Sequence, residues 1–190
     1  MQVVILGGNG YLGHNLIQRW LKQDPQVTFT VLGRASQADF TEKRVNHVQA
    51  DATDHAQLKT AMPSSVDIII DLIGRPEKDP KTFDQVNTIP AYNMLQLAQE
   101  FKIPTMGFVI GKLGPKAFIK GKQAILDHLK ASGIRTEAVA PTLVYGNGRQ
   151  DSMTKLVPLL KFFGLFSANL KPVHVDQVTQ ELIDKLTHEN

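Results

Sequence analysis

Short apolar runs alternate along the chain with longer segments in which apolar residues recur every three or four positions. The runs are rich in β-branched residues and lie between glycine, proline or polar residues, a pattern typical of strands buried on both faces. Each longer segment carries one apolar stripe, which is typical of a helix packed against a sheet. The pattern predicts strands within residues 3–7, 27–33, 45–51, 64–74, 104–111 and 134–141. It predicts helices over residues 10–23, 88–101, 116–133 and 176–189.

This order of elements predicts the fold class. Strands that alternate with helices form βαβ units, in which parallel strands are joined by helical crossovers. Because such crossovers are right-handed, we expect a doubly wound α/β fold, with helices on both faces of a parallel sheet. The 190 residues contain no internal repeat and no linker, so a single domain is expected.

Individual residues predict where some helices begin and end. Pro90 falls in the first turn of its helix, where the missing N–H costs little. Gly133 is placed to end the helix before the sixth strand. Asp176 is the expected N-cap of the last helix.

Four glycines, Gly7, Gly8, Gly10 and Gly13, follow the first predicted strand. Gly8, Gly10 and Gly13 fit G-x-G-x-x-G, while Gly7, Gly10 and Gly13 fit G-x-x-G-x-x-G. In both registers Gly10 allows close approach of a pyrophosphate and Gly13 allows tight packing of helix on strand. The next helix directs its N-terminal amides and positive dipole end at the anion. This context favours a dinucleotide site over the alternative, a tight strand–helix turn without a ligand.

Residues at the ends of the second, third and fourth predicted strands indicate which dinucleotide binds. The second strand ends at Arg34, where a site for NAD usually has an acidic residue for the ribose hydroxyls. Since an Arg can pair with a 2′-phosphate, we expect NADP rather than NAD, with a solvated surface Arg34 as the alternative. Asp51 either accepts from the adenine amino group or caps the helix that follows, with Asp54 favourable to its dipole. Ile73 and Gly74 end the fourth strand, where small residues let a cofactor lie on the sheet edge.

Composition narrows the choice of partner. The formal net charge is +3, from 21 Lys and Arg against 18 Asp and Glu, and the pI is about 9.1. No run of basic residues is present, which argues against nucleic-acid binding, while the mild cationic excess suits a phosphate-bearing ligand. The absence of cysteine excludes disulfides, thiol nucleophiles and Cys-ligated metal sites, and no metal is expected. The chain opens on no signal-peptide pattern and has no apolar stretch of the ~18 residues that a spanning helix needs, so we expect a cytoplasmic protein.

Several segments together resemble the short-chain dehydrogenase/reductase superfamily, in its extended and atypical branch of NAD-dependent epimerase/dehydratase and NmrA-like NAD(P)-binding proteins. They follow the family's order over almost the whole chain: GGNGYLG, QADATD, DQVNTIPAYNMLQLAQ, KQAILDHLKASGIRTEAVAPTLVYGNGR and PVHVDQV. The resemblance implies a Rossmann fold over residues 1–190, with residues 143–172 as a short C-terminal cap or substrate segment. It implies that NAD(P) is held by Gly7, Gly10, Tyr11, Leu12, Gly13, Arg34, Asp51, Ile73, Gly74 and Lys122.

The same resemblance implies a degraded catalytic site. Family enzymes use a Tyr-x-x-x-Lys pair, in which the Lys holds the nicotinamide ribose and lowers the pKa of the catalytic Tyr. Lys122 matches the Lys, but Phe118 stands in place of the Tyr, and a phenyl ring has no proton to donate. The family's Ser is also missing, since residues 110–112 read Ile-Gly-Lys. Asn87 matches a family Asn near the site, or only starts a helix.

Other titratable candidates near the expected cleft are Lys112, Tyr145 and His174. We interpret His174 as ordering the backbone before the last helix rather than as catalytic. The apolar segment 155–166 is interpreted as a cap helix folded on the core. Its alternatives are a substrate lid, the surface of a homodimer, or a membrane-surface contact.

Two functions are compatible with an intact cofactor site. The first is an NAD(P)H-dependent oxidoreductase acting on a small carbonyl, a quinone or a flavin. The second is a cofactor-binding protein without turnover, such as a redox sensor, regulator or assembly factor. A sugar-nucleotide epimerase is disfavoured, because residues 143–171 are too few for the usual substrate pocket and Phe118 replaces the Tyr.

Overall fold

The computed structural model describes residues 1–34, 42–149 and 171–188, and these ranges contain the expected parallel sheet of six strands. The strand order is β3-β2-β1-β4-β5-β6, so the chain winds outward from β1 to β3 and returns to β4 on the other side of β1. This is the order of a doubly wound Rossmann fold. The strands are β1 (Gln2–Leu6), β2 (Thr28–Gly33), β3 (Val45–Gln49), β4 (Ile68–Asp71), β5 (Thr105–Val109) and β6 (Arg135–Val139).

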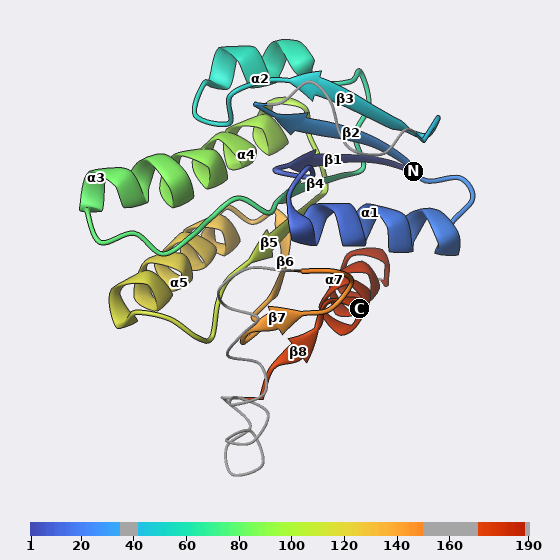
Figure 1. The fold of residues 1–190 in the computed structure, drawn as a ribbon. Helices are drawn as coiled ribbons and strands as arrows, with labels where there is room; N and C mark the ends of the chain where they lie inside the picture. Colours follow the sequence, from blue (N-terminus) through green and yellow to red (C-terminus); the bar gives the residue numbers. More distant parts are fainter. Residues whose placement is uncertain (35–41, 150–170, 189–190) are drawn as a thin grey trace.

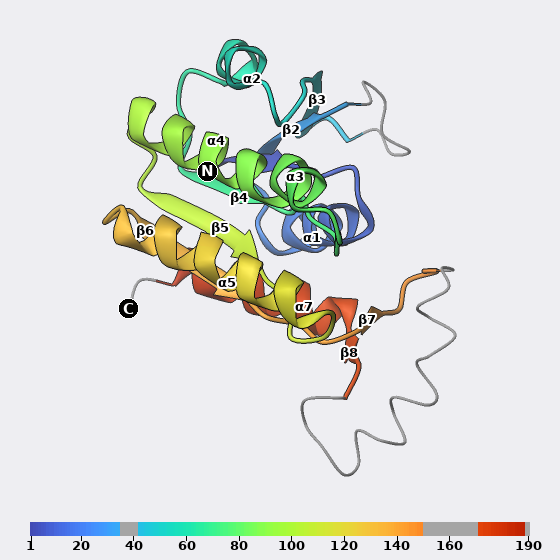
Figure 2. The ribbon, with the colours of Figure 1, turned by 90° about the vertical axis from the view of Figure 1, so that its left-hand side faces the viewer.

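Helices cover both faces of this sheet (Figure 1). On one face lie α1 (Tyr11–Gln23) and α7 (Val175–Thr187). The other face, turned toward the viewer in Figure 2, carries α2 (His55–Ala61), α4 (Ile89–Glu100) and α5 (Lys116–Ala131). All four residues of β4 are buried between these layers, as a continuous apolar run predicts for a parallel strand.

Alternation along β1 divides the core into two halves. Val4 and Leu6 pack in the cluster that includes α4 and α5, whereas Val3 and Ile5 pack in the cluster that includes α1 and α7. In the second cluster Trp20 lies edge-to-face on a strand aromatic, with ring centroids 5.7 Å apart. Packing in the first cluster turns one face of α5 toward the sheet, and packing in the second cluster does the same for α7 on the opposite side.

The connection from β4 to α4 differs from the sequence expectation. α4 is preceded by α3 (Pro80–Phe83) and by η1 (Asp84–Thr88), a π-helical turn, so helical backbone starts well before residue 88. Pro90 does lie in the first turn of α4, as expected. The Ile89 N–H bonds to the carbonyl of Asp84, five residues back, and Pro90 offers no N–H to continue the ladder. The wider turn therefore falls where the proline interrupts regular helical hydrogen bonding.

The helix ends are partly as expected. Gly133 follows α5 with a φ of 80°, the left-handed conformation of a glycine that terminates a helix. The expected cap of α7 is wrong: the N-cap is His174, whose Nδ1 accepts the Asp176 N–H at 3.3 Å. Asp176 lies inside the first turn, where its charge favours the helix dipole. The interpretation of His174 as a residue that orders the backbone is thus confirmed.

Of residues 143–172, which were expected to form a cap, the structure describes 143–149 and 171–172. β7 (Val144–Tyr145) and β8 (Val173–His174) form a small parallel sheet. The predicted cap helix at residues 155–166 lies outside the described residues. None of the described helices is long and apolar enough to cross a membrane.

Candidate dinucleotide site

A pocket of about 620 Å³ opens at the carboxyl ends of the parallel strands, where the strand order reverses between β1 and β4. In doubly wound folds this crevice is where ligands bind. The loops after β1, β2, β3 and β4 line the pocket together with η1 and the start of α4. The lining residues are Gly7, Asn9, Gly10, Gly33, Arg34, Ala50, Asp51, Ala52, Thr53, Leu72, Ile73, Arg75, Gln85, Val86 and Pro90.

Two glycines shape the pocket side of the first loop. Gly7 has a φ of 77°, a conformation that favours glycine, and its carbonyl accepts the Gly10 N–H at 3.0 Å. Gly10 is the residue that precedes α1. Gly8 instead faces the sheet, where a Cβ would lie 2.9 Å from Val31 Cγ1. The pocket-lining glycines are therefore those of the G-x-x-G-x-x-G register.

The rest of the glycine motif supports this loop from behind. A Cβ on Gly13 would lie 2.5 Å from the Cα and carbonyl oxygen of Gly8, so glycine lets α1 pass this close to the loop. Leu12 packs against the core cluster beneath α1. Tyr11 donates its hydroxyl to the Gly146 carbonyl at 2.9 Å. The side chains of Tyr11 and Leu12 are thus outside the pocket lining, although these residues form the first turn of α1.

Arg34 and Asp51 lie close together beyond the ends of β2 and β3. Asp51 accepts the N–H of Thr53 at 2.9 Å and its hydroxyl at 2.8 Å. These bonds lower the pKa of Asp51, with a smaller contribution from the Arg34 charge. The cap of α2 is Asp54, which accepts the Gln57 N–H at 3.1 Å. The alternative in which Asp51 caps this helix is therefore wrong, because its carboxylate is engaged in its own turn.

The backbone after β4 is held by Asn87, which is completely buried. Asn87 Oδ1 accepts the Arg75 N–H at 3.2 Å, and Nδ2 donates to the Arg75 carbonyl at 3.0 Å. A Cβ on Gly74 would lie 2.7 Å from Asn87 Oδ1 and 3.0 Å from Lys122 Nζ. Gly74 therefore makes room for two polar side chains behind the pocket edge, and does not itself line the pocket. Asn87 does more than start a helix, since it fixes the backbone at Arg75.

Lys122 projects from α5 toward the same edge. Its Nζ donates to the Ile73 carbonyl at 3.3 Å and lies 4.0 Å from the centroid of the Phe108 ring. Burial lowers the pKa of Lys122 to about 8, and the charge of Asp71 opposes that shift. Burial also raises the pKa of the Asp71 carboxyl to about 6, against the opposing charge of Lys122.

Asp71 is a residue that sequence reasoning missed. The signal that could have found it is an acidic residue at the carboxyl end of the run Ile-Ile-Ile-Asp, since a strand buried on both faces has no solvated side for a carboxylate. The strand also lies next to the switch point of the sheet, where ionisable residues are often functional.

The position expected for a catalytic acid is apolar. Phe118 is buried, and its ring lies edge-to-face on Phe83 with centroids 6.4 Å apart. After β5, the side chain of Lys112 is exposed. Tyr145 and His174 contact each other in the small β7–β8 sheet, with ring centroids 5.3 Å apart, and neither lines the pocket. Lys122, one of the titratable candidates, bonds to Ile73 of the pocket lining.

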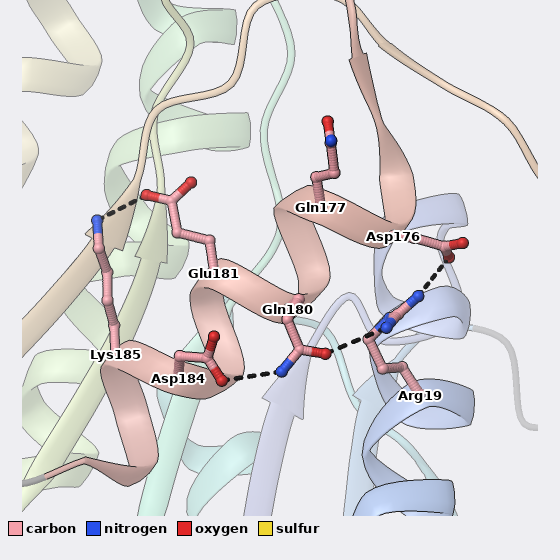
Figure 3. A pocket seen from close by; sticks show the side chains of 7 residues that line it. All are labelled: Arg19, Asp176, Gln177, Gln180, Glu181, Asp184 and Lys185. Carbon is pink, nitrogen blue, oxygen red and sulfur yellow. Dashed lines mark hydrogen bonds and ion pairs between the residues drawn. The ribbon is translucent and has the colours of Figure 1, made fainter.

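A second pocket, of about 540 Å³, lies between α1 and α7 (Figure 3). Its side chains bond to one another: Arg19 pairs with Asp176 at 2.9 Å and donates to Gln180 at 3.1 Å, and Lys185 pairs with Glu181 at 2.8 Å. Because the Arg19 bonds join α7 to α1, we interpret this pocket as a polar seam between two helices. Within the described part of the chain, no group of three or more His, Asp or Glu side chains is placed to hold a metal ion.

Known proteins share this sequence pattern and architecture. The profile of the NAD dependent epimerase/dehydratase family matches residues 3–111, more than half of the chain. No curated protein sequence matches it. The Bordetella bronchiseptica enzyme WbmH in complex with NAD+ has a TM-score of 0.75 at 16% identity, over 100% of this chain and 73% of that chain. dTDP-glucose 4,6-dehydratase from Bacillus anthracis in complex with NAD has a TM-score of 0.76 at 14% identity, over 100% and 73%. Serine dehydrogenase from Escherichia coli has a TM-score of 0.73 at 14% identity, over 100% of this chain and 92% of that chain.

Proposed function

The chain belongs to the NAD dependent epimerase/dehydratase family, and from that premise we propose that its 620 Å³ pocket binds a nicotinamide dinucleotide, NADP in preference to NAD. The observation that carries the proposal is the pair Gly7 and Gly10, which line the pocket where α1 begins. Backbone amides and the positive end of a helix dipole at that place suit a pyrophosphate. Two of the similar solved structures hold NAD.

Arg34 supports the choice of NADP. It follows β2, at the place where a carboxylate would hold the ribose hydroxyls of NAD. The guanidinium group presents several N–H donors in a plane and so matches a phosphate. The hydrogen bonds from Thr53 lower the pKa of Asp51 most, and the nearby Arg34 charge lowers it further. A bound 2′-phosphate would therefore compete with the Asp51 carboxylate for Arg34.

Calorimetric titration with NADPH and NADH tests this preference. Arg34→Ala should weaken NADPH binding about tenfold or more and leave NADH binding unchanged, because a hydrogen bond to a charged group contributes about 1.5–3 kcal/mol. Lys43→Ala is the matched control, since Lys43 is exposed, carries the same charge and lies outside the pocket lining. Equal affinity for the two cofactors with a silent Arg34→Ala would end the NADP assignment. Absence of binding by both cofactors would end the dinucleotide assignment itself.

We infer further that the protein is an oxidoreductase acting on a small carbonyl, a quinone or a flavin. Bound NADPH would supply the hydride. In this proposal Lys122, whose Nζ donates to the Ile73 carbonyl, would hold the hydroxyls of the nicotinamide ribose. Phe118 has no proton for a product oxygen, which favours acceptors that take their proton from solvent, such as flavins and quinones.

The second candidate is a cofactor-binding protein without turnover, and the buried Phe118 at the position of the acid favours it. NADPH consumption measured against a panel of carbonyls, quinones and flavins separates the two functions. Steady consumption with one acceptor class supports the oxidoreductase. Tight NADPH binding without consumption across the panel supports a sensor, regulator or assembly factor.

A further inference from the structure

Two buried ionisable side chains, Asp71 and Lys122, bond to the same residue of the pocket edge, Ile73. Asp71 is the last residue of β4 and lies in register between Leu6 of β1 and Phe108 of β5. Alternation along β4 places Asp71 on the same face as Ile69, which packs in the cluster with α4 and α5. Lys122 approaches that face from α5, with its Nζ against the Phe108 ring. The Asp71 carboxylate thus enters the apolar cluster from the sheet, and the Lys122 ammonium enters the same cluster from α5.

Lys122 interrupts an apolar helix face. The buried residues of α5 are spaced as a single stripe: Phe118, Lys122, Ile125, Leu126 and Leu129. Only 2% of Lys122 is exposed. An ammonium group at such a position is costly unless an anion accompanies it. Core packing would be served by leucine or methionine, so the charge calls for a role other than packing.

Both side chains hold the same pocket residue. Asp71 Oδ1 accepts the Ile73 N–H at 2.8 Å, and Lys122 Nζ donates to the Ile73 carbonyl at 3.3 Å. Within the described residues, the buried Asp71 Oδ2 receives no hydrogen bond. An ammonium group has three donors, and among the same residues the Ile73 carbonyl takes one. The pair therefore keeps donor capacity directly behind the pocket lining.

The two charges act on each other without competition from neighbours. The other charged or titratable side chains of α5, η1 and α4 are exposed: Lys116, Lys120, Asp127, His128, Lys130, Asp84, Tyr92 and Glu100. β1 and β5, which flank β4, carry no ionisable side chain. Burial raises the pKa of Asp71 and lowers that of Lys122, and each charge opposes the shift of the other.

We propose that Asp71 is a positioning residue of this site: its carboxylate keeps the Lys122 ammonium charged behind Ile73 for the nicotinamide ribose. Asp71 does not touch the ligand and acts through Lys122. The proposal rests on the proposed function, because the ribose belongs to the bound dinucleotide. Burial lowers the pKa of Lys122, and the Asp71 charge is the influence that opposes this shift.

Asp71→Asn tests the proposal, because the amide keeps the shape and an acceptor for the Ile73 N–H but removes the charge. In protein labelled with ¹³C at the lysine side chains, the Lys122 signal is assigned by its loss in Lys122→Gln and followed against pH without ligand. We expect the pKa of Lys122 to fall from about 8 to about 7 or below, since a nearby opposite charge typically contributes 1–3 pH units. Asp67→Asn, at an exposed carboxylate directly before β4 that accepts the Gln2 N–H at 2.7 Å, should leave it unchanged.

The same variants are titrated with NADPH and NADH at several pH values. Asp71→Asn should bind either cofactor about tenfold more weakly than wild type at pH 8 and with nearly equal affinity at pH 5.5, where Lys122 is protonated in both proteins. A merely structural role would weaken binding by the same factor at every pH. That result, or an unchanged Lys122 titration, overturns the proposal.

Two further outcomes are distinct. If Asp71→Asn moves the Lys122 titration but wild type binds neither cofactor, the proposed function fails and the positioning role fails with it, while the coupling of the two charges stands. If Asp71→Asn does not fold, Lys122→Gln measures the coupling from the other side. The pKa of the Asp71 carboxyl, followed by ¹³C NMR, should then rise above about 6, and an unchanged value overturns the proposal.

Discussion

Alanine at Gly13 and alanine at Gly10 should separate folding from ligand binding. Both glycines belong to the same motif, but the structure gives them different surroundings. The Gly13 Cβ position is filled by backbone of Gly8, whereas the Gly10 Cβ position has one neighbour within 4 Å, the Gly7 carbonyl oxygen at 3.3 Å. Gly13→Ala should therefore cost stability, and Gly10→Ala should cost binding.

The magnitudes follow from these distances. A new methyl on Gly13 would lie 2.5 Å from Gly8 atoms, against about 3.5–4.0 Å for relaxed carbon contacts, so α1 or the loop must move by about 1 Å. Because backbone yields less than side chains, we expect the upper end of overpacking costs, about 3 kcal/mol. In a domain of this size that lowers the Tm by about 6–12 °C.

Gly10→Ala should change the free energy of unfolding by less than about 1 kcal/mol. Alanine can adopt the φ of −76° and ψ of 168° found at Gly10. Alanine is a weaker N-cap than glycine, but it also reduces the conformational entropy of the unfolded chain, and the two effects on stability offset each other. The alanine methyl would occupy the surface that a pyrophosphate approaches, so NADPH binding should weaken at least tenfold, about 1.4 kcal/mol.

Thermal unfolding by circular dichroism and calorimetric titration with NADPH measure the two effects on the same preparations. A Gly13→Ala protein that melts within about 2 °C of wild type would refute the packing argument, because one kcal/mol already shifts the Tm by about that much. A Gly10→Ala protein that binds NADPH as tightly as wild type would show that the phosphates do not lie on this residue.

Four further predictions concern the charges and the missing phenol. The pKa of Lys122 is lowered on folding from 10.5 to about 8, so wild type should gain about 3 kcal/mol of stability in urea titrations as pH rises from 8 to 10.5, a gain that Lys122→Met lacks. The raised pKa of Asp71 has the opposite sign, since its stabilising contribution is full below pH 3.8 and is lost as pH rises through about 6, and Asp71→Asn should flatten that fall. Arg19→Ala, which removes bonds to α7, should lower the Tm by about 2–4 °C, and an unchanged Tm would show that the seam of Figure 3 adds no stability. Phe118→Tyr should raise the rate of NADPH-dependent reduction of a carbonyl at least tenfold if the site descends from an enzyme, and an unchanged rate in a folded variant would contradict that descent.

Predictions failed where two local solutions competed for one segment. Asp51 and Asp54 are both acceptable helix caps by residue type, and the backbone geometry assigns the cap to Asp54 because Asp51 closes a turn on Thr53. Asp176 was expected to cap α7, but pairing of β7 with β8 extends the backbone through His174 and leaves its ring to accept the first amide. The turn η1 was not expected because it reflects hydrogen bonding around Pro90 rather than an apolar period.

Sequence patterns were enough to predict the order of strands and helices, the parallel doubly wound sheet and the glycine loop before α1. These follow from short apolar runs, from apolar stripes that recur every three or four residues and from a glycine motif, and all of these are local patterns. The folded chain was needed to bring Asp71 and Lys122 to the same pocket residue, Ile73. Their placement depends on the strand order that sets β4 beside β5 and on the face that α5 turns to the sheet, and both are settled by packing between segments far apart in the chain.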